Sequence, residues 1–553
     1  MIRNYLLLIF LAFLGKQSFA QNAISIPDTL SGSAFTLSMH KDSVQFFPGK
    51  KTQTLGFNQY SYLGPTLILN KGQNISITVN NNISDTTNVH WHGLHVSPSN
   101  DGGPHTMIMN GMSWNPQFNI LNKASTFWYH PHFHGKTAEQ AIKGAAGLII
   151  VRDSIEATLN IPRSYGVDDF PIIVQCAEFD SLNQLMPRGM QDSVLLVNGK
   201  RTNNGQSAYL NVPAQVVRLR LLNASGERTF NFGFTNNRNF KIIGSDGGLL
   251  NAPFNTTRIR ISPGERYEIL LDLSGMSGQS LYLMSYASEL ATGIQGGPTM
   301  PMPPGNPPMN SPLNGVNFNI LQLNVISQTS NPITAFPNNL VQVNTIPSSQ
   351  SNRTRVIDMT AINQMSMDGP FYFNGKLFDM DSINYIIPLD DTEIWEIKNS
   401  TMVAHPFHIH DVQFNILDRD GNLPPVNERA FKDVVLIKPQ ETVRFITKFE
   451  TFTDTVLPYV YHCHVLMHED DGMMGQFLVV PQNYTGINNS MQLTKSLKIY
   501  PNPTTDYFNF ELPNNTNFDL RIFDMTGKLV KSINSQSNTS IDITSLTPNN
   551  YVV

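Results

Sequence analysis

The sequence QVVRLRLLN at residues 215–223 alternates apolar and polar side chains and returns later in the chain. Its second copy is DTEIWEIKN at residues 391–399, so Asn223 and Asn399 end the two copies at an offset of 176 residues. Alternation with a period of two is typical of a β-strand with one buried face. The two copies therefore predict equivalent strands in two related domains.

Two turns recur at the same offset of 176 residues, which extends the repeat beyond one strand. NGK at 198–200 matches NGK at 374–376, and PGE at 263–265 matches PQE at 439–441. A further strand of this kind, QNISITVNN at residues 73–81, lies upstream. We therefore predict an all-β protein with three consecutive Greek-key β-sandwich domains, because the spacing suits a sandwich of ordinary length.

The ends of the chain differ in composition from this repeat and set the outer domain boundaries. The expected divisions are a signal peptide at 1–20, domain 1 at 21–157, domain 2 at 158–330, domain 3 at 331–481, a polar linker at 482–496 and a small β-module at 497–553.

Composition and charge exclude several classes of protein. Charged residues make up 14% of the 553 residues and the formal net charge is −5, so the chain lacks the basic excess that binds a phosphate backbone. Nucleic acid is therefore not an expected partner. Only two cysteines occur, Cys176 and Cys463, which excludes a framework of several disulfides. Cys176 falls in an apolar, strand-like run and is expected to be a buried, inert thiol.

The N-terminus has the three parts of a secretory signal peptide. Arg3 supplies the positive charge, residues 5–14 form the apolar run, and Ser18-Phe19-Ala20 is a small-residue cleavage site. The alternative is an uncleaved anchor, but the run is too short to cross a bilayer. No other segment is long and apolar enough, so we expect an exported chain with no transmembrane segment after cleavage.

Ten of the fourteen histidines fall in tight motifs in domains 1 and 3. Each domain carries a His-x-His pair nine residues after its strand-ending asparagine and a second pair further on, whereas domain 2 has Phe232 and Phe234 at the first of these places. The eight histidines are His90, His92, His130, His132, His408, His410, His462 and His464. Residues i and i+2 of a strand face one way, so the eight imidazoles converge if the two domains meet. Eight imidazoles suit several copper ions better than one tetrahedral zinc.

A second site is expected in domain 3 only. Cys463 lies between two of these histidines and faces away from them, with His468 and Met473 following and His405 preceding. Two histidines, one cysteine and one methionine are the ligand set of a blue-copper electron-transfer site. Adjacent residues in the chain thus connect this site to the histidine cluster. The alternative, that these are ordinary hydrogen-bonded core histidines, does not explain so dense a pattern.

Together these motifs resemble the multicopper oxidase family, which consists of three cupredoxin domains. The resemblance implies cupredoxin-like domains and four copper ions. Electrons from the substrate enter at the type 1 ion and pass to the other three, where dioxygen is reduced to water. Its implied ligands are His405, Cys463, His468 and Met473 for type 1 copper, His90 and His408 for type 2, and His92, His130, His132, His410, His462 and His464 for the type 3 pair.

The stretches DGGP at 101–104 and HED at 468–470 are similar to those of the bacterial copper-efflux and bilirubin-oxidase-like members. That likeness implies that Asp101 lies near the cluster and that Glu469 helps to deliver protons. Reduction of dioxygen to water consumes protons, so nearby carboxylates are expected. The alternative for each is a surface or turn carboxylate.

Three functions remain open from the sequence. The first is oxidation of Cu(I) for copper tolerance, because thioethers are soft ligands for that ion. The second is a laccase-like oxidation of small phenols, and the third is copper sequestration. The resemblance adds Asp433 as a Cu(I)-binding acid near type 1 copper, with Met365 and Met367 as further candidate ligands. The long Met/His-rich insert of the copper-efflux oxidases is otherwise absent before Asn374, which weakens the Cu(I) interpretation. The three methionine groups are Met107, Met109 and Met112; Met300, Met302 and Met309 in a Pro/Gly-rich loop; and Met359, Met365, Met367 and Met380. Gap-filling or loop cover is the alternative for each group.

The C-terminal module contains LKIYPNP at residues 497–503 and LRIFD at 520–524. It resembles the sorting domain of type IX secretion, which implies contact with an export machinery and a location on the outer-membrane surface or outside the cell. A periplasmic location is the alternative. Such domains usually continue past the point where Val553 stands, so both a truncated module and a partial resemblance stay open.

Overall fold

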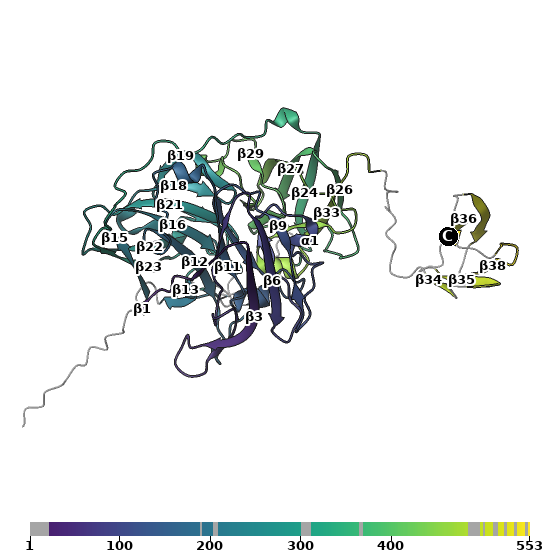
Figure 1. Ribbon diagram of the computed structural model, residues 1–553, viewed down its shortest axis with the longest axis horizontal. Helices are drawn as coiled ribbons and strands as arrows, with labels where there is room; N and C mark the ends of the chain where they lie inside the picture. Colours follow the sequence, from purple (N-terminus) through teal and green to yellow (C-terminus); the bar gives the residue numbers. More distant parts are fainter. Residues whose placement is uncertain are drawn as a thin grey trace, which may run out of the picture. The chain divides into compact units, whose positions relative to one another are not determined.

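The computed structural model describes two compact units, Met1–Gln482 and Asn483–Val553, which are treated separately. Within them, the described residues are 22–188, 191–202, 208–299, 311–363, 369–484, 498–500, 504–511, 518–524, 528–535, 539–547 and 551–552. The predicted signal peptide and most of the predicted linker therefore lie outside the described residues. The larger unit contains three β-sandwiches, coloured from purple through teal to green in chain order (Figure 1).

Domain 1 is a sandwich of two sheets with strand orders β2-β5-β11-β10-β7 and β4-β3-β6-β8, with β9 also paired to β6. Its strands are β2 Thr29–Ser31, β3 Ala34–Val44, β4 Thr52–Phe57, β5 Thr66–Asn70, β6 Asn74–Asn82, β7 His90–His92, β8 Ser113–Trp114, β9 Gln117–Asn119, β10 Ser125–His130 and β11 Gly147–Arg152. Two short helices, α1 Pro98–Asp101 and α2 Thr137–Ile142, lie in its loops.

Domain 2 has the strand orders β14-β13-β12-β16-β21-β18-β19 and β1-β15-β23-β22-β17-β20. Its strands are β1 Asn22–Ala23, β12 Asp169–Ala177, β13 Val194–Val197, β14 Lys200–Thr202, β15 Ala208–Pro213, β16 Val216–Asn223, β17 Phe230–Phe234, β18 Phe240–Ser245, β19 Gly248–Thr256, β20 Ile259–Ile261, β21 Arg266–Asp272, β22 Ser280–Tyr286 and β23 Asn317–Ile326.

Domain 3 has the strand orders β25-β24-β27-β31-β29 and β26-β33-β32-β28-β30. Its elements are β24 Arg353–Ala361, β25 Phe371–Phe373, β26 Tyr385–Pro388, β27 Thr392–Asn399, β28 His405–Ile409, β29 Asn415–Arg419, β30 Val434–Ile437, β31 Thr442–Lys448, β32 Tyr459–Cys463, helix α3 Leu466–Asp470 and β33 Met474–Val480.

The repeated strands occupy one topological position in all three domains. β16 lies between parallel β12 and antiparallel β21, and β27 lies between parallel β24 and antiparallel β31. In domain 1, β6 lies between parallel β3 and antiparallel β8 and β9. The predicted all-β fold of three cupredoxin-like sandwiches is therefore confirmed.

The asparagine that ends each of these strands has a structural reason. Asn81, Asn223 and Asn399 are buried, and each side-chain carbonyl accepts the backbone N–H two residues later. Each side-chain amide also donates to backbone carbonyls both in the following turn and on a separate segment. A buried amide with these partners loses no hydrogen bond on burial, and it fixes the turn that leads to the first His-x-His position.

Two boundaries differ from those expected. Strand β1 pairs in parallel with β15 of domain 2, so the described chain begins on domain 2 before it enters domain 1. After β23, Ile333 still accepts a hydrogen bond from Val216, and Leu340 is buried in the domain 2 core. The chain reaches domain 3 near Ile346, which donates its backbone N–H to Asn415. Apolar side chains after residue 330 thus extend the cover of domain 2.

In its described residues, the smaller unit has two three-stranded sheets, ordered β34-β35-β38 and β37-β36-β39. Its strands are β34 Lys498–Tyr500, β35 Tyr507–Glu511, β36 Phe518–Asp524, β37 Leu529–Ser535, β38 Thr539–Asp542 and β39 Tyr551–Val552. Four buried side chains, Phe508, Leu520, Ile522 and Ile541, form its core.

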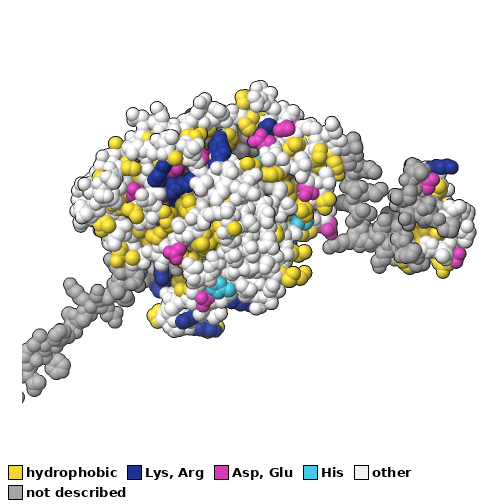
Figure 2. Space-filling view, in the orientation of Figure 1, with side chains coloured by type: hydrophobic (Ala, Val, Ile, Leu, Met, Phe, Trp, Pro, Cys, Tyr) yellow, Lys and Arg dark blue, Asp and Glu magenta, His cyan; other side chains and the backbone are white. Residues whose placement is uncertain are grey.

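In the described parts of both units, the helices are all too short or too polar to cross a membrane. On the face drawn in Figure 2, lysine and arginine side chains gather in small separate groups rather than in one stripe. This agrees with the acidic net charge of the chain.

Candidate metal centre

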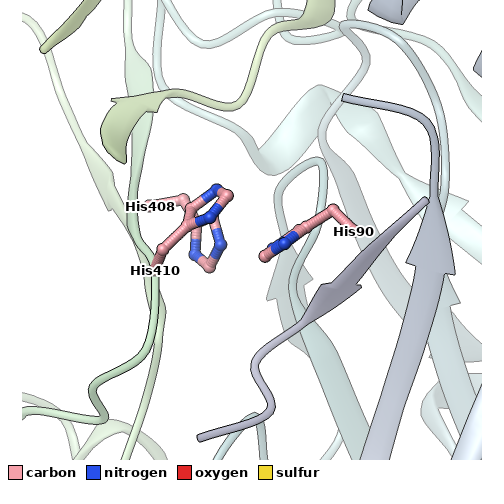
Figure 3. A group of neighbouring side chains, drawn as sticks. All are labelled: His90, His408 and His410. Atoms are coloured by element: carbon pink, nitrogen blue, oxygen red, sulfur yellow. The ribbon is translucent and has the colours of Figure 1, made fainter. Parts of the chain in front are cut away.

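Domains 1 and 3 bring the eight predicted histidines to one buried place. β7 pairs with β10 in domain 1, with His90 opposite His130, and β28 pairs with β32 in domain 3, with His408 opposite His462. In Figure 3, His90 extends from a domain 1 strand toward His408 and His410 of domain 3. All eight side chains are at most 1% exposed.

Six of the rings form two groups of three. The first triad is His92, His130 and His464, in which Nδ1 of His92 lies 3.4 Å from Nε2 of His130 and 3.3 Å from Nε2 of His464. The second triad is His132, His410 and His462. There, Nε2 of His132 lies 3.1 Å from Nε2 of both other rings. Each triad combines rings from both domains.

The remaining pair, His90 and His408, faces the triads with nitrogens that have no partner. Nε2 of each ring is buried and has no hydrogen bond, although a buried polar atom normally has one. His90 stacks on His410 at 3.7 Å between ring centroids, and His408 stacks on His92 at 3.8 Å. Two orphaned ring nitrogens between two triads fit bound metal ions.

In four of the eight rings, a backbone carbonyl holds the nitrogen that faces away from the cluster, which fixes the tautomer of that ring. Nδ1 of His90, His130, His408 and His462 lies 2.7–3.0 Å from a backbone carbonyl. A ring that donates from one nitrogen keeps the lone pair of the other for a metal, and such partners raise the basicity of ligating histidines.

Burial keeps six of these rings neutral. Burial, followed by the charges of neighbouring imidazoles, lowers the pKa of six of the eight rings well below the ordinary value: His92, His130, His132, His408, His410 and His464. Neutral imidazole is the form that ligates a metal, so the cluster favours the binding of metal cations over protonation.

The mononuclear set lies on the other side of β32. Sγ of Cys463 lies 3.5 Å from Nδ1 of His405 and 3.6 Å from Nδ1 of His468. Thr401 orients His405, because its hydroxyl lies 3.0 Å from Nε2 of that ring. Burial raises the pKa of the Cys463 thiol, so a bound metal is needed to hold it as a thiolate.

Met473 lies next to this set through its backbone and is fully buried. Its carbonyl accepts the N–H of Cys463 at 3.0 Å, and its N–H donates to the carbonyl of His468 at 2.8 Å. A soft, buried set of this composition fits copper.

The comparison with known proteins agrees with this geometry. Three models of the multicopper oxidase family match residues 38–156, 174–299 and 345–483. The multicopper oxidase mco of Staphylococcus haemolyticus is 33% identical over 470 residues, which cover 83% of this chain and 92% of that protein. The chain belongs to the multicopper oxidase family. It is a copper-dependent oxidoreductase that uses dioxygen as the electron acceptor.

Other relatives carry different names. A solved structure of a laccase-like multicopper oxidase, CueO from Ochrobactrum sp., is 30% identical, has a TM-score of 0.71, and is aligned over 83% of this chain and 100% of that one. The cell division protein FtsP of Escherichia coli is 29% identical over 83% of this chain and 93% of its own length. A model of the secretion system C-terminal sorting domain matches residues 498–553, so this multicopper oxidase carries an export signal at its C-terminus.

The two expected proton carriers lie against the oxidase cluster. Oδ2 of Asp101 lies 2.8 Å from Nδ1 of His410. The Glu469 carboxylate lies 3.4 Å from Nδ1 of His132 and 3.1 Å from Nδ1 of His462. Both carboxylates are at most 2% exposed, so neither is a surface acid.

The expectation for Asp433 is wrong. Its carboxylate is fully buried beside the cluster, where Oδ1 lies 3.2 Å from Nε2 of His92. Arg266 of domain 2 donates to both oxygens at 2.5 and 2.7 Å. A carboxylate held in this way cannot receive Cu(I) at the surface. The residues predicted to accompany it, Met365 and Met367, lie outside the described residues.

The other residues noted in the sequence make structural contacts or pack in the interior. Nδ1 of His95 pairs with Asp411 at 2.7 Å, and Nε2 of His105 contacts Gln476 at 2.8 Å. Cys176 is buried, as expected, at the edge of a cavity. Phe232 of domain 2 is also buried and supplies core packing where domains 1 and 3 supply histidine.

The methionine groups fall into different environments. Met359 is fully buried in the domain 3 core, which favours gap filling, and Met380 is half-buried. Met300, Met302 and Met309 lie outside the described residues. Met107, Met109 and Met112 are exposed.

Sequence reasoning missed Arg266, Thr401 and Phe371. The ring of Phe371 lies 4.7 Å from that of His405 and 4.5 Å from that of His468, between centroids. These residues carry no metal-ligand signal. Arg266 directly follows the repeated PGE turn, but its counterpart at the repeat offset is Thr442, so the repeat did not indicate this position either.

Proposed function

We propose that this oxidase holds four copper ions and that its physiological substrate is Cu(I). The proposed ligands are His405, Cys463, His468 and Met473 for type 1 copper, His90 and His408 for type 2, and the two triads for the type 3 pair. Copper bound at these residues supplies the one-electron chemistry and the site at which dioxygen is reduced to water. The orphaned Nε2 atoms and the two triads support three of these ions, and the mononuclear set supports the fourth.

The position of Cys463 connects the two parts of the centre. His462 belongs to the second triad and His464 to the first, and Cys463, the last residue of β32, is bonded to both. An unbroken chain of covalent bonds therefore joins the mononuclear set to each triad. This arrangement supports a role for Cys463 in electron delivery as well as in binding.

Asp101 and Glu469 are proposed to hold and move protons. Each acid contacts a ligand histidine through the ring nitrogen that faces away from the metal. The balance is four Cu(I), one dioxygen and four protons giving four Cu(II) and two waters, so protons must reach a site that excludes solvent. Buried carboxylates at hydrogen-bond distance are suited to this transfer.

The observation that carries the substrate proposal is a cavity beside His468. It has a volume of about 270 Å³ and lies between domain 2, α3 and the end of α2. Its lining includes three sulfur side chains, Cys176, Met186 and Met467. Four carboxylates, Glu178, Asp192, Glu227 and Asp471, also line it. Arg188, which also lines the cavity, pairs with Asp471, and Arg228 pairs with Asp192, so the lining keeps a smaller but net negative charge. Sulfur ligands suit Cu(I), and a net negative charge attracts a cation.

A second candidate is oxidation of a small phenol. The cavity also has the apolar side chains Ile142, Ala177 and Pro187, and its volume admits a single ring. The laccase-like enzyme of Ochrobactrum sp. has oxidase activity towards lignin model compounds, which supports the same alternative here. Copper sequestration without turnover is the third and least supported candidate, because both triads and the mononuclear set are complete.

Oxygen uptake by the copper-loaded protein separates these candidates. We would offer Cu(I) and a simple phenol separately to the parent protein and to the double variant Met186→Leu/Met467→Leu. The expected result is a tenfold or larger rise in KM for Cu(I) and no change for the phenol, because leucine keeps the volume but removes the thioether. Met276→Leu, which is distant in domain 2, is the matched control.

Uptake with the phenol and none with Cu(I) would overturn the substrate proposal in favour of a laccase-like function. Tight binding of Cu(I) without oxygen uptake would favour sequestration.

We also propose that the exported protein resides on the outer-membrane surface or outside the cell. The sorting-domain match at residues 498–553 supports this location. Removal of residues 483–553 should retain the protein in the periplasm, as measured by fractionation and oxidase activity. An unchanged distribution would contradict the proposal.

A further inference from the structure

A short loop of domain 1 exposes three methionines next to one buried isoleucine. Met107, Met109 and Met112 are 59%, 62% and 60% exposed, whereas Ile108 is 2% exposed. Methionine is ordinarily a core residue, and clustered apolar exposure marks a site of interaction. Within residues 107–112 the exposed large apolar side chains are all thioethers, so the composition points to sulfur chemistry rather than to general apolar contact.

The backbone presents Met107 and Met109 on one side. The N–H of Ile108 donates to the carbonyl of Thr87 at 2.8 Å, and the N–H of Thr87 donates to the carbonyl of Ile108 at 3.1 Å. This bridge makes the backbone at Ile108 locally extended and turns its side chain inward. In an extended segment the residues before and after share the opposite face. Their Cα atoms are then roughly 7 Å apart.

A tight turn returns the third thioether to the same place. The N–H of Met112 donates to the carbonyl of Met109 at 2.9 Å, and Gly111 has a φ of +77°. Glycine at the third position with positive φ is the signature of a type II turn, which holds its end residues within about 7 Å. The backbone of Asn81 fixes the turn, since its carbonyl accepts the Gly111 N–H at 2.8 Å and its N–H donates to the Met112 carbonyl at 3.0 Å.

We propose that Met107, Met109 and Met112 form a binding site for one Cu(I) ion on the surface of domain 1. Met109 is the common neighbour of the other two, and three long, flexible side chains on a fixed backbone can reach one ion. Thioethers are soft, uncharged ligands that select Cu(I) over hard cations and over Cu(II). The site is built only from domain 1, whereas the cavity beside His468 takes its sulfur atoms from domains 2 and 3.

This site does not rest on the proposed substrate, because binding can be measured without turnover. Ag(I) is a soft monovalent ion with no oxidation to undergo here, so it serves as the probe. The full-length, copper-loaded protein with 13C-labelled methionine methyl groups would be titrated with Ag(I). The matched variant is Met107→Leu/Met109→Leu/Met112→Leu, which keeps the apolar volume. Met276→Leu is the control substitution.

The proposal predicts that the triple variant binds one fewer equivalent of Ag(I) than the parent protein. It also predicts that the three methyl signals shift together at one equivalent, and that each single variant weakens this binding at least tenfold. Oxygen uptake with a phenol should be the same in the parent and the triple variant. An unchanged Ag(I) stoichiometry in the triple variant, or methyl signals that shift independently, would overturn the proposal.

Discussion

Nε2 of His92 lies 3.2 Å from Oδ1 of Asp433, so His92 presents Nδ1, not Nε2, to His130 and His464. Arg266 holds the same carboxylate from domain 2. Domain 2, which has Phe232 and Phe234 where the other two domains have histidines, thus helps to set the geometry of the histidine cluster. It does so through a buried ion pair, in which loss of one partner is far more costly than loss of both.

Asp433→Asn tests this contact. The amide keeps the shape of the side chain but removes the charge that pairs with Arg266 and fixes the His92 tautomer. We expect copper content to fall below that of the parent protein, blue colour to be retained, and turnover to decrease by roughly 10–100-fold. Copper analysis and absorption spectra would measure this.

Glu393→Gln is the control for Asp433→Asn, because Glu393 is also buried against an arginine, Arg355, but outside the cluster. If both variants lose copper equally, the effect is general destabilisation and the positioning role of Asp433 is contradicted.

Cys463→Ser should abolish the blue colour, because a serine hydroxyl does not replace the thiolate. Oxygen uptake with any reductant should be lost, while copper bound by the two triads remains. Visible absorption and copper stoichiometry together test this. Full oxidase activity in the variant would show that the mononuclear assignment is wrong.

Asp101→Asn should slow turnover without loss of copper. Its side chain can still accept the Nδ1–H of His410, so the ring stays oriented, but an amide cannot take up and release a proton at neutral pH. We expect a decrease of roughly 100-fold in kcat with KM for the reductant little changed. A steady-state comparison at matched copper content measures both constants, and an unchanged kcat would exclude Asp101 from proton transfer.

The pKa of Asp169 predicts how the stability of domain 2 changes at acid pH. Burial opposes its ionisation, but Arg220 and Arg218 outweigh burial and lower its pKa to about 2, below the 3.8 of the unfolded chain. The folded state then binds fewer protons, so this stabilisation is complete above about pH 4 and is lost as the pH falls toward 2. It amounts to about 2 kcal/mol.

The difference in free energy of unfolding between the parent protein and Asp169→Asn should accordingly shrink by about 2 kcal/mol between pH 5 and pH 2. Denaturant unfolding at several pH values, followed by fluorescence, measures it. A difference that is independent of pH would contradict the assignment.

The sequence was sufficient to predict features that are local and repeated along the chain. The strand ending in Asn223 and its copies follow from alternation, and the His-x-His motifs follow from ligand type and strand geometry. These patterns predicted both the three sandwiches and the residues that the structure brings together.

Features that depend on contacts between distant segments could not be predicted. Asp433 was misplaced because its neighbours, His92 and Arg266, come from two other domains. The cavity beside His468 combines Met186 of domain 2 with Met467 of α3, residues that are far apart in the chain. A repeating pattern in the sequence does not show which distant segments come into contact.

The most direct test of the oxidase account is the ratio of dioxygen consumed to Cu(I) oxidised by the copper-loaded protein, with hydrogen peroxide measured in parallel. Coupling of one-electron oxidations to complete reduction predicts one dioxygen for four Cu(I) and no peroxide. A ratio of one to two with accumulating peroxide would contradict the account, because the cluster would then release dioxygen half-reduced.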